Sequence, residues 1–142
     1  MYKDLGTVII TGRTGTGKSN LIEKYINQII DDKDTIIYII DLKRVDLFEY
    51  AKKQNVEYIT SIEDIEEKLI NPIQKNEEYD KNKYIFIDEY FSIYFSRNYH
   101  NQIKKILKKR KNLNLNIIMA SQEKTVFSQG MRKNVDAIIH LN

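Results

Sequence analysis

The feature that most constrains this chain is the octapeptide Gly-Arg-Thr-Gly-Thr-Gly-Lys-Ser at residues 12–19, which follows the apolar run Thr7–Thr11. Closely spaced glycines let successive backbone N–H groups turn inward, and they form a concave anion site where the next helix begins. In such a loop, Lys18 reaches the β- and γ-phosphates of a nucleoside triphosphate, and the Ser19 hydroxyl is a ligand of Mg²⁺. Strand, loop and helix come in the order that the motif requires, so we predict an ATP site rather than a chance glycine-rich turn. The residues predicted to bind ATP are Gly12, Arg13, Thr14, Gly15, Thr16, Gly17, Lys18, Ser19 and Asn20.

Apolar runs along the rest of the chain predict a mainly parallel sheet that is covered on both faces. Thr35–Ile40 is apolar and β-branched without alternation, which is typical of strands buried on both sides. Similar runs occur at residues 83–87, 115–122 and 137–141. A chain of 142 residues suffices for one domain with a single core and leaves no room for a second. We therefore predict one three-layer α/β domain over residues 1–142.

Two further segments carry structural expectations. A helix is expected at Asn20–Ile30, because its apolar residues recur every three or four positions and form a stripe that packs on the sheet. In the middle of the chain, residues 56–60 predict a short strand. A second helix is expected to begin at Ser61 and to end near Asn71-Pro72, because proline disfavours helical torsions in the residue before it.

Composition limits the class of protein. The sequence has no cysteine, which excludes disulfides and thiolate metal sites and fits a reducing cytoplasm. No apolar run approaches the roughly 20 residues of a membrane span, and the N-terminus lacks a signal-peptide pattern. The net charge of +3 is too small to indicate a nucleic-acid-binding protein by itself. We expect a soluble cytoplasmic protein with no membrane segment in this chain.

Two adjacent carboxylates follow the apolar run at residues 84–87, where a phosphate-loop protein needs an acid. Asp88 is predicted to hold Mg²⁺ together with Ser19, directly or through water. Glu89 is predicted to accept a proton from the water that attacks the γ-phosphate, or to orient it. A solvated turn would also explain two acids at a strand end, but the glycine-rich loop upstream favours the catalytic interpretation.

Leu115–Ser121 is another apolar run, and it leads into Gln122. In phosphate-loop ATPases that insert an extra strand between the loop strand and the acidic strand, a polar residue at the tip of that strand faces the γ-phosphate. Gln122 suits this position because its amide both accepts and donates hydrogen bonds. The alternative is a glutamine exposed in a surface loop.

Four stretches together resemble the FtsK/HerA superfamily of ring-forming ATPases, which includes DNA translocases, conjugative-transfer motors and viral genome-packaging ATPases. Besides the phosphate loop, they are Asp-Leu-Lys-Arg-Val-Asp-Leu at 41–47, Ile-Phe-Ile-Asp-Glu at 85–89, the basic turn and strand at 110–122, and residues 130–139. The resemblance implies a RecA-like fold with core strand order 5-1-4-3-2. It also implies that the protein self-associates into a hexameric ring. The polymer that such a ring would move is double-stranded DNA.

The chain also departs from the family pattern. Leu42 stands where the family has proline, and Ser121-Gln122 replaces Thr-Gln. The family's larger members have membrane, winged-helix and pore regions that are not found here, which argues against chromosome segregation. The chain is then either the motor domain of a longer protein or a minimal ATPase of a phage, plasmid or integrated element. The alternatives are an assembly or secretion ATPase of the zonula occludens toxin type, whose polymer is protein, and a nucleotide switch with low turnover.

Ring ATPases commonly complete their site with an arginine from the neighbouring subunit. Arg110 is the first candidate and Arg132 the second, because both lie in the stretches that resemble the family. The lysines around Ile103–Arg110 are predicted either to form a solvated basic face or to contact phosphates. The aromatic residues between Tyr90 and Tyr99 are expected to pack in the core or against a neighbour rather than on bases, and His100 and His140 are expected to be structural.

Overall fold

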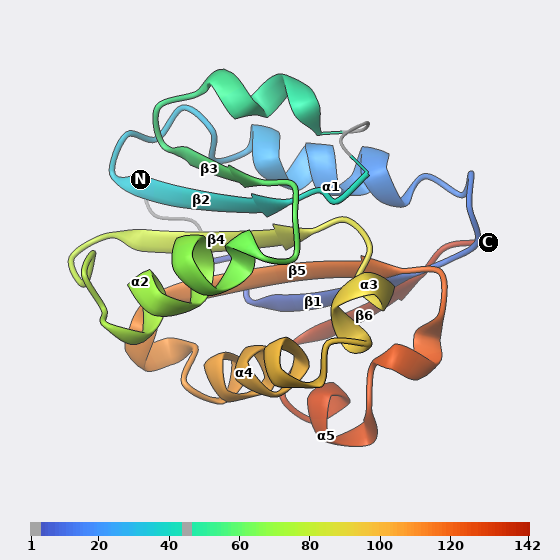
Figure 1. The fold of residues 1–142 in the computed structure, drawn as a ribbon. Helices are drawn as coiled ribbons and strands as arrows, with labels where there is room; N and C mark the ends of the chain where they lie inside the picture. Colours follow the sequence, from blue (N-terminus) through green and yellow to red (C-terminus); the bar gives the residue numbers. More distant parts are fainter. Residues whose placement is uncertain (1–3, 44–46) are drawn as a thin grey trace.

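The computed structural model describes residues 4–43 and 47–142. Its core is a sheet of six parallel strands in the order β3-β2-β4-β5-β1-β6 (Figure 1). The strands are β1 (Thr7–Thr11), β2 (Thr35–Ile40), β3 (Val56–Ile59), β4 (Asn82–Ile87), β5 (Leu115–Ser121) and β6 (Ala137–His140). The predicted order 5-1-4-3-2, which counts only the five core strands, is therefore confirmed. The short strand predicted at residues 56–60 is present as β3 and extends the sheet beyond β2.

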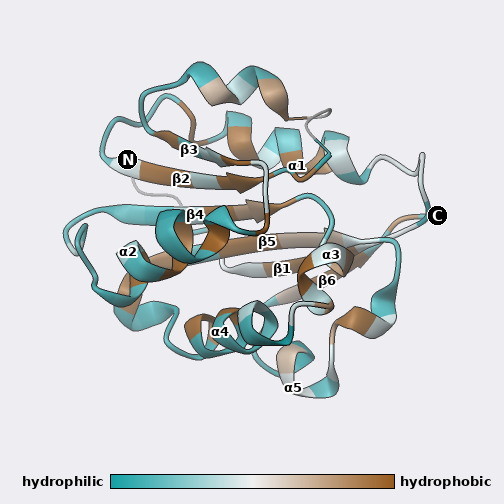
Figure 2. Ribbon diagram, in the orientation of Figure 1, coloured by the Kyte–Doolittle hydropathy of each residue, from teal (hydrophilic) through white to brown (hydrophobic). Residues whose placement is uncertain are grey.

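The central strands are buried on both faces, as their unbroken apolar sequences predicted. Every residue of β1 and β5 is buried, and so is nearly all of β2 and β4. Figure 2 shows the strands in hydrophobic colours, whereas the helices carry hydrophilic colours on their outer sides. Strand β6 differs, because three of its four residues are exposed.

Helices cover the two faces of the sheet unequally (Figure 1). One face packs on α1 through Ile22 and Ile26, and the other packs on the remaining helices through residues such as Ile93, Ile103 and Ile106. The α-helices are α1 (Lys18–Asn27), α2 (Asn71–Gln74), α3 (Phe91–Tyr94), α4 (Arg97–Lys108) and α5 (Gln129–Arg132). The short 3₁₀ and π turns are η1 (Phe48–Lys52), η2 (Glu66–Ile70), η3 (Lys111–Leu113) and η4 (Lys124–Val126). Within the described ranges, no helix is long and apolar enough to cross a membrane.

Candidate nucleotide-binding site

The loop between β1 and α1 lies at the edge of the sheet where the parallel strands end. Gly17, just before the first turn of α1, has a φ of 98°, which glycine adopts without steric cost. A Cβ on Gly12 would lie 2.6 Å from Thr16 Oγ1 and 2.9 Å from the carbonyl oxygen of Leu141, so this turn has no room for a side chain. The Thr16 hydroxyl closes the loop by donating to the carbonyl oxygen of Arg13 at 2.7 Å.

Lys18 points into this loop. Its Nζ donates to the carbonyl oxygen of Gly12 and, at 3.1 Å, to that of Arg13. The first turn of α1 contains no acidic residue, so the partial positive charge of the helix N-terminus is not offset there. The ammonium group and the helix N-terminus together favour an anion, as binding of a triphosphate requires.

Ser19 and Asp88 meet across the mouth of the loop, as the prediction of a shared metal requires. Ser19 Oγ donates to Asp88 Oδ1 at 3.0 Å. The Asp88 backbone N–H donates to the carbonyl oxygen of Ile40, and this contact fixes the aspartate at the end of β4. Mg²⁺ prefers oxygen ligands and usually takes one or two from the protein, with phosphates and water supplying the rest. Ser19 and Asp88 would supply two such oxygen ligands, so this donor set fits Mg²⁺ bound together with ATP.

Glu89 is held at the end of β5, the strand inserted between β1 and β4. Its Oε2 accepts from Ser121 Oγ at 2.5 Å and from the Phe91 backbone N–H at 3.0 Å, and its Oε1 accepts from the Gln122 N–H at 3.1 Å. Three donors on one carboxylate restrict its orientation. The carboxylate is therefore positioned by two segments, the tip of β5 and the start of α3.

Gln122 connects this carboxylate to the phosphate loop. The Thr14 hydroxyl donates to Gln122 Oε1 at 3.0 Å, while the Gln122 backbone contacts Glu89. The side chain of Gln122 is exposed, as the alternative of a surface glutamine also predicted. Its contacts nevertheless place it between the loop and the predicted base, where a sensor of the γ-phosphate is expected.

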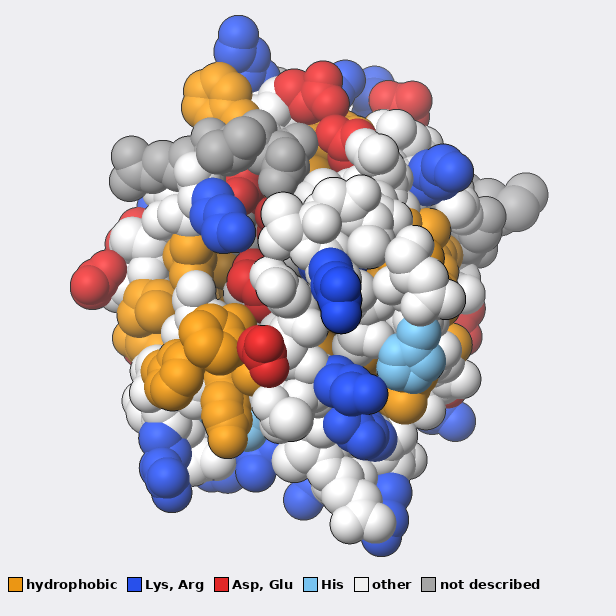
Figure 3. Space-filling model, turned by 90° about the vertical axis from the view of Figure 1, so that its right-hand side faces the viewer, with side chains coloured by type: hydrophobic (Ala, Val, Ile, Leu, Met, Phe, Trp, Pro, Cys, Tyr) orange, Lys and Arg blue, Asp and Glu red, His pale blue; other side chains and the backbone are white. Residues whose placement is uncertain are grey.

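A cavity of about 330 Å³ joins the phosphate loop to Asp88 and Glu89, and Gln122 does not line it. Figure 3 looks onto the side of the molecule where the strands end. The cavity is lined by Thr14, Gly15, Gly17, Lys18, Ser19, Asn20, Lys43, Asp88 and Glu89. Arg13 is exposed beside it. Lys43 is a site residue that was not predicted from the sequence, although a cation three residues beyond the end of β2 lies at the same edge as Asp88.

The segment that follows β2 is anchored by Asp41. Its fully buried carboxylate accepts from Tyr58 at 2.6 Å and from the Leu47 N–H at 3.2 Å. Lys43 therefore lines the cavity two residues after a backbone position that is held in place by Asp41. Arg44, Val45 and Asp46, which carry part of the family resemblance, lie outside the described residues.

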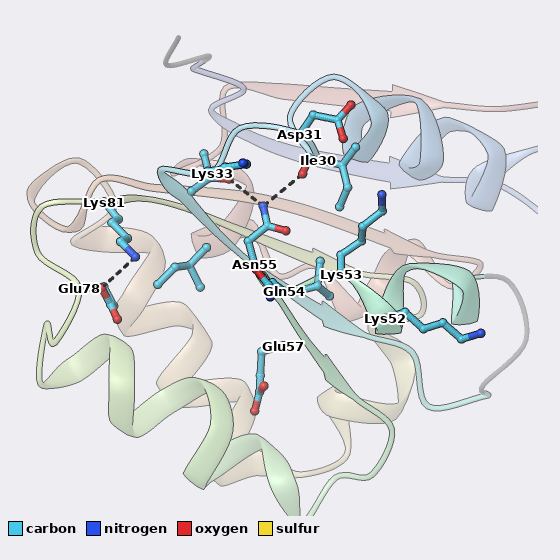
Figure 4. A pocket seen from close by; sticks show the side chains of 13 residues that line it. Ile30, Asp31, Lys33, Lys52, Lys53, Gln54, Asn55, Glu57, Glu78 and Lys81 are labelled. Atoms are coloured by element: carbon cyan, nitrogen blue, oxygen red, sulfur yellow. Dashed lines mark hydrogen bonds and ion pairs between the residues drawn. The ribbon is translucent and has the colours of Figure 1, made fainter.

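A larger cavity of about 710 Å³ lies at the opposite end of the sheet (Figure 4). Its wall combines cations such as Lys33, Lys52 and Lys53 with the carboxylates of Asp31 and Glu57. None of the predicted ATP-binding residues lines it. Size alone therefore does not identify the nucleotide site, which is marked by the chemistry of its lining.

Arg110 is remote from its own chain's nucleotide cavity. Its Nη1 donates to the carbonyl oxygen of Leu115 at 2.9 Å, and the guanidinium pairs with Asp4 and Asp136 at 3.4 and 3.5 Å. Leu115 begins β5 and Ser121 ends it, so the length of that strand separates Arg110 from Glu89 by about 20 Å. The predicted catalytic role of Arg110 is possible only in the site of a neighbouring subunit.

We expect Arg110→Ala to lower the free energy of unfolding by about 2 kcal/mol, because a charge-assisted hydrogen bond is lost with two exposed ion pairs. Urea denaturation measures this change. The matched control is Lys111→Ala, which removes the neighbouring exposed cation and should leave stability within about 0.5 kcal/mol of the parent. Unchanged stability of Arg110→Ala would contradict the fold-stabilising role. A fall in turnover among folded molecules would in addition support a role in a neighbour's site.

Arg132, the second candidate, is exposed and lies in α5. Its Nε donates to the carbonyl oxygen of Phe127 at 2.9 Å, and its Nη2 donates to that of Lys124 at 3.1 Å. Both candidate arginines are therefore engaged within their own chain.

Comparison with known proteins gives one family and one curated relative. The family model described as AAA domain matches residues 5–141. The ESX secretion system protein YukB of Bacillus subtilis (strain 168) is 36% identical over 70 residues, which cover 47% of this chain and 5% of YukB. The chain thus spans a small part of that relative.

Solved structures give the same fold. EssC (ATPases 2 and 3) from Geobacillus thermodenitrificans has a TM-score of 0.82 at 13% identity, covering 95% of this chain and 32% of that one. The pCW3 conjugation coupling protein TcpA, in its monomer form with ATPγS, has a TM-score of 0.76 at 18% identity. The match covers 93% of this chain and 47% of TcpA. B204, the DNA-packaging ATPase from Sulfolobus Turreted Icosahedral Virus, has a TM-score of 0.73 at 21% identity. The match covers 98% of this chain and 76% of B204. At these identities the likeness shows the fold alone, and that fold is the one of FtsK/HerA-type P-loop ATPases.

Proposed function

Because the chain belongs to the AAA domain family and is a P-loop ATPase, we propose that it couples Mg²⁺-dependent ATP hydrolysis to the movement of DNA. The observation that carries the proposal is the contact between Ser19 and Asp88 beside Glu89, at the mouth of the phosphate loop. A pair of metal ligands next to a positioned carboxylate is typical of a site that hydrolyses ATP, and a site that only binds ATP would not need the carboxylate.

In this proposal the phosphate loop binds and orients ATP. Lys18 and the backbone N–H groups at the start of α1 hold the phosphates, and Thr14 and Asn20 line the same cavity. Ser19 and Asp88 would hold Mg²⁺, which would supply positive charge to neutralise the charge that develops on the phosphate oxygens. Lys43 adds a cation to the cavity wall, where it would stabilise the same phosphates.

Glu89 acts on the attacking water. An ionised carboxylate accepts the water's proton as the oxygen attacks the γ-phosphorus, and the bond to the β-phosphate oxygen breaks. Ser121 and the Gln122 N–H fix the direction of that carboxylate. Gln122 also contacts Thr14 of the loop, so its amide is placed to respond when the γ-phosphate is present or lost.

The names of two similar solved proteins bear on the polymer that is moved. TcpA is named a conjugation coupling protein and B204 a DNA-packaging ATPase, and both names support DNA as the polymer. A ring of six identical subunits in the cytoplasm remains our prediction from the family resemblance. In such a ring, Arg110 or Arg132 would complete a neighbour's site.

A DNA motor should hydrolyse ATP faster when double-stranded DNA is added. We expect this stimulation to weaken as salt rises, because contacts to phosphates release counterions and their strength falls with salt concentration. Phosphate release is measured on the assembled protein, with and without duplex DNA, across a salt series. Failure of DNA both to bind and to stimulate the assembled protein would rule out translocation.

A second candidate is an ATPase for protein secretion or assembly. The observation that favours it is the 36% identity to the ESX secretion system protein YukB over 70 residues, together with the fold similarity to EssC. This candidate predicts stimulation by a polypeptide rather than by DNA.

A nucleotide switch with little turnover would show neither response, and it would hydrolyse ATP slowly under every condition.

A further inference from the structure

An exposed aromatic surface lies immediately after the predicted catalytic carboxylate. The spacing of the aromatic residues between Tyr90 and Tyr99 predicts that they pack in the core or against a neighbour, and Tyr90 does lie in the core. Phe91, Tyr94 and Phe95, however, are 40%, 39% and 73% exposed. Their rings contact one another edge to face, with Phe91 and Phe95 centroids 4.8 Å apart. Figure 3 shows apolar side chains gathered at the lower left of this side of the molecule, and such patches commonly mark interaction sites.

This surface borders a groove with a cationic wall. The groove has a volume of about 430 Å³, and we call it the α3–α4 groove. It is lined by Tyr94, Phe95, Arg97, His100, Asn101 and Lys104. The lining contains two aromatic rings and two permanent cations but no carboxylate. Aromatic rings combined with cations match the bases and phosphates of a nucleic acid.

His100 is a fixed, neutral part of the lining. Its Nδ1 forms a 2.7 Å hydrogen bond with the hydroxyl of buried Tyr90. Burial, together with Lys104 and Arg97, lowers the pKa of His100 below its ordinary value. The imidazole is therefore neutral at pH 7 and presents a flat ring beside Tyr94, with centroids 5.2 Å apart.

The cationic wall continues along α4, whose sequence contains no acidic residue. Arg97, Lys104 and Lys108 are spaced by seven and four residues, so they lie on one side of the helix. At 1.5 Å per residue they span about 16 Å, which is the length of a short run of nucleotides. This stripe also disfavours a second copy of α4 as the occupant, because like charges would face each other.

We propose that the α3–α4 groove binds single-stranded nucleic acid, with bases stacked on Tyr94 and Phe95 and phosphates on Arg97 and Lys104. Stacking requires an exposed base face, which a single strand offers and an intact duplex does not. The inference rests on the proposed function in taking DNA as the polymer, and it adds where an unpaired stretch is held. Stacking and phosphate contacts are tolerant of sequence, so we expect little sequence preference.

The test measures fluorescence anisotropy of labelled oligothymidylate and of a duplex of the same length, titrated with the assembled protein. Phe95→Ala should weaken single-strand binding about tenfold, since stacking on an aromatic ring contributes that much per base. A plot of the logarithm of the binding constant against the logarithm of the salt concentration should become less steep in the double variant Arg97→Ala/Lys104→Ala. The slope should change by about 1.4, which corresponds to two lost phosphate contacts on a single strand. Duplex binding should change less with Phe95→Ala than single-strand binding does.

The matched control is Lys52→Ala/Lys53→Ala, which removes two exposed cations from the larger cavity at the other end of the sheet (Figure 4). The control should bind oligothymidylate like the parent, and an equal loss would mean that binding is diffuse and the groove is not the site. Circular dichroism confirms that each variant is folded.

Three further outcomes overturn the inference. If groove variants bind both probes like the parent while duplex DNA still stimulates ATPase activity, the groove is excluded and the motor proposal stands. If the parent binds neither probe, the DNA motor proposal fails as well. If Phe95→Ala changes the mass of the assembly in light scattering while nucleic-acid binding per subunit is retained, the groove is an interface between subunits.

Discussion

Glu89→Gln is expected to abolish steady-state ATP hydrolysis while leaving ATP bound. The amide of glutamine cannot take the proton of the attacking water, and losing a general base typically lowers the rate by about 10²- to 10⁴-fold. Phosphate release measures turnover, and titration with a fluorescent ATP analogue measures binding. Rapid turnover in this variant would mean that Glu89 is not the base.

The control for Glu89→Gln is Ser121→Ala. Both oxygens of the Glu89 carboxylate accept hydrogen bonds, from Ser121, Phe91 and Gln122. The amide of glutamine has only one accepting oxygen, and its NH₂ group cannot accept from these donors. The substitution therefore disturbs local hydrogen bonds in addition to removing the base. Ser121→Ala removes one of the three hydrogen bonds to the carboxylate, and also the bond that Ser121 Oγ accepts from the Glu123 N–H, but it keeps the carboxylate. It should therefore lower turnover only about tenfold, as the loss of a single hydrogen bond to a charged group allows.

Lys18→Ala is expected to weaken ATP binding by about 100-fold or more, because contacts from an ammonium to phosphate are charge-assisted and each contributes about 1.5–3 kcal/mol. The same ammonium holds the carbonyl groups of Gly12 and Arg13, so the loop itself should loosen. Isothermal titration calorimetry with ATP and Mg²⁺ measures the affinity.

Lys24→Ala is the control for Lys18→Ala. Lys24 is exposed in the last turn of the same helix, α1, so its removal changes the net charge equally without touching the loop. This control should bind ATP like the parent. Binding by Lys18→Ala that matches the control would show that phosphates are not held by this loop.

Much of the fold could be predicted because local sequence encodes it. Unbroken apolar runs identified the central strands, since strands buried on both faces have no polar side. The strand order could not come from those runs, because pairing between β1 and β5 joins residues such as Thr7 and Ile117 that are far apart in the chain. The family resemblance supplied that information, and the observed order agrees with it.

Some helix boundaries were predicted wrongly. The helix expected at Asn20–Ile30 is α1, which spans Lys18–Asn27. The helix expected to end near Asn71-Pro72 continues through α2 to Gln74. Pro72 lies in the first turn of α2, just after the π turn η2, where the regular hydrogen-bond ladder is already interrupted. The missing N–H of proline therefore costs less there than in an unbroken helix. Nothing in the local sequence reveals such a turn.

The site was predictable where one segment forms it and less so where several meet. The loop and Asp88 follow from motifs, whereas the contacts of Ser121 and Lys43 depend on strands brought together by the sheet. A signal for Ser121 was present, because serine at the position of the family's threonine keeps a hydroxyl at the strand tip. For Lys43 the signal was its position just past the end of β2.

The register of β1 has a consequence for how the chain reaches its native state. Strand β1 comes first in the sequence, yet both of its neighbours, β5 and β6, begin only at Leu115 and Ala137. During synthesis the apolar residues of β1 therefore stay unpaired until β5 and β6 have been made, and pairing of such distant segments is slow. The contact between Thr14 of the phosphate loop and Gln122 depends on the pairing of β1 with β5. The nascent chain should thus gain affinity for ATP late and abruptly, and until then its first strand is the segment most in need of protection from aggregation.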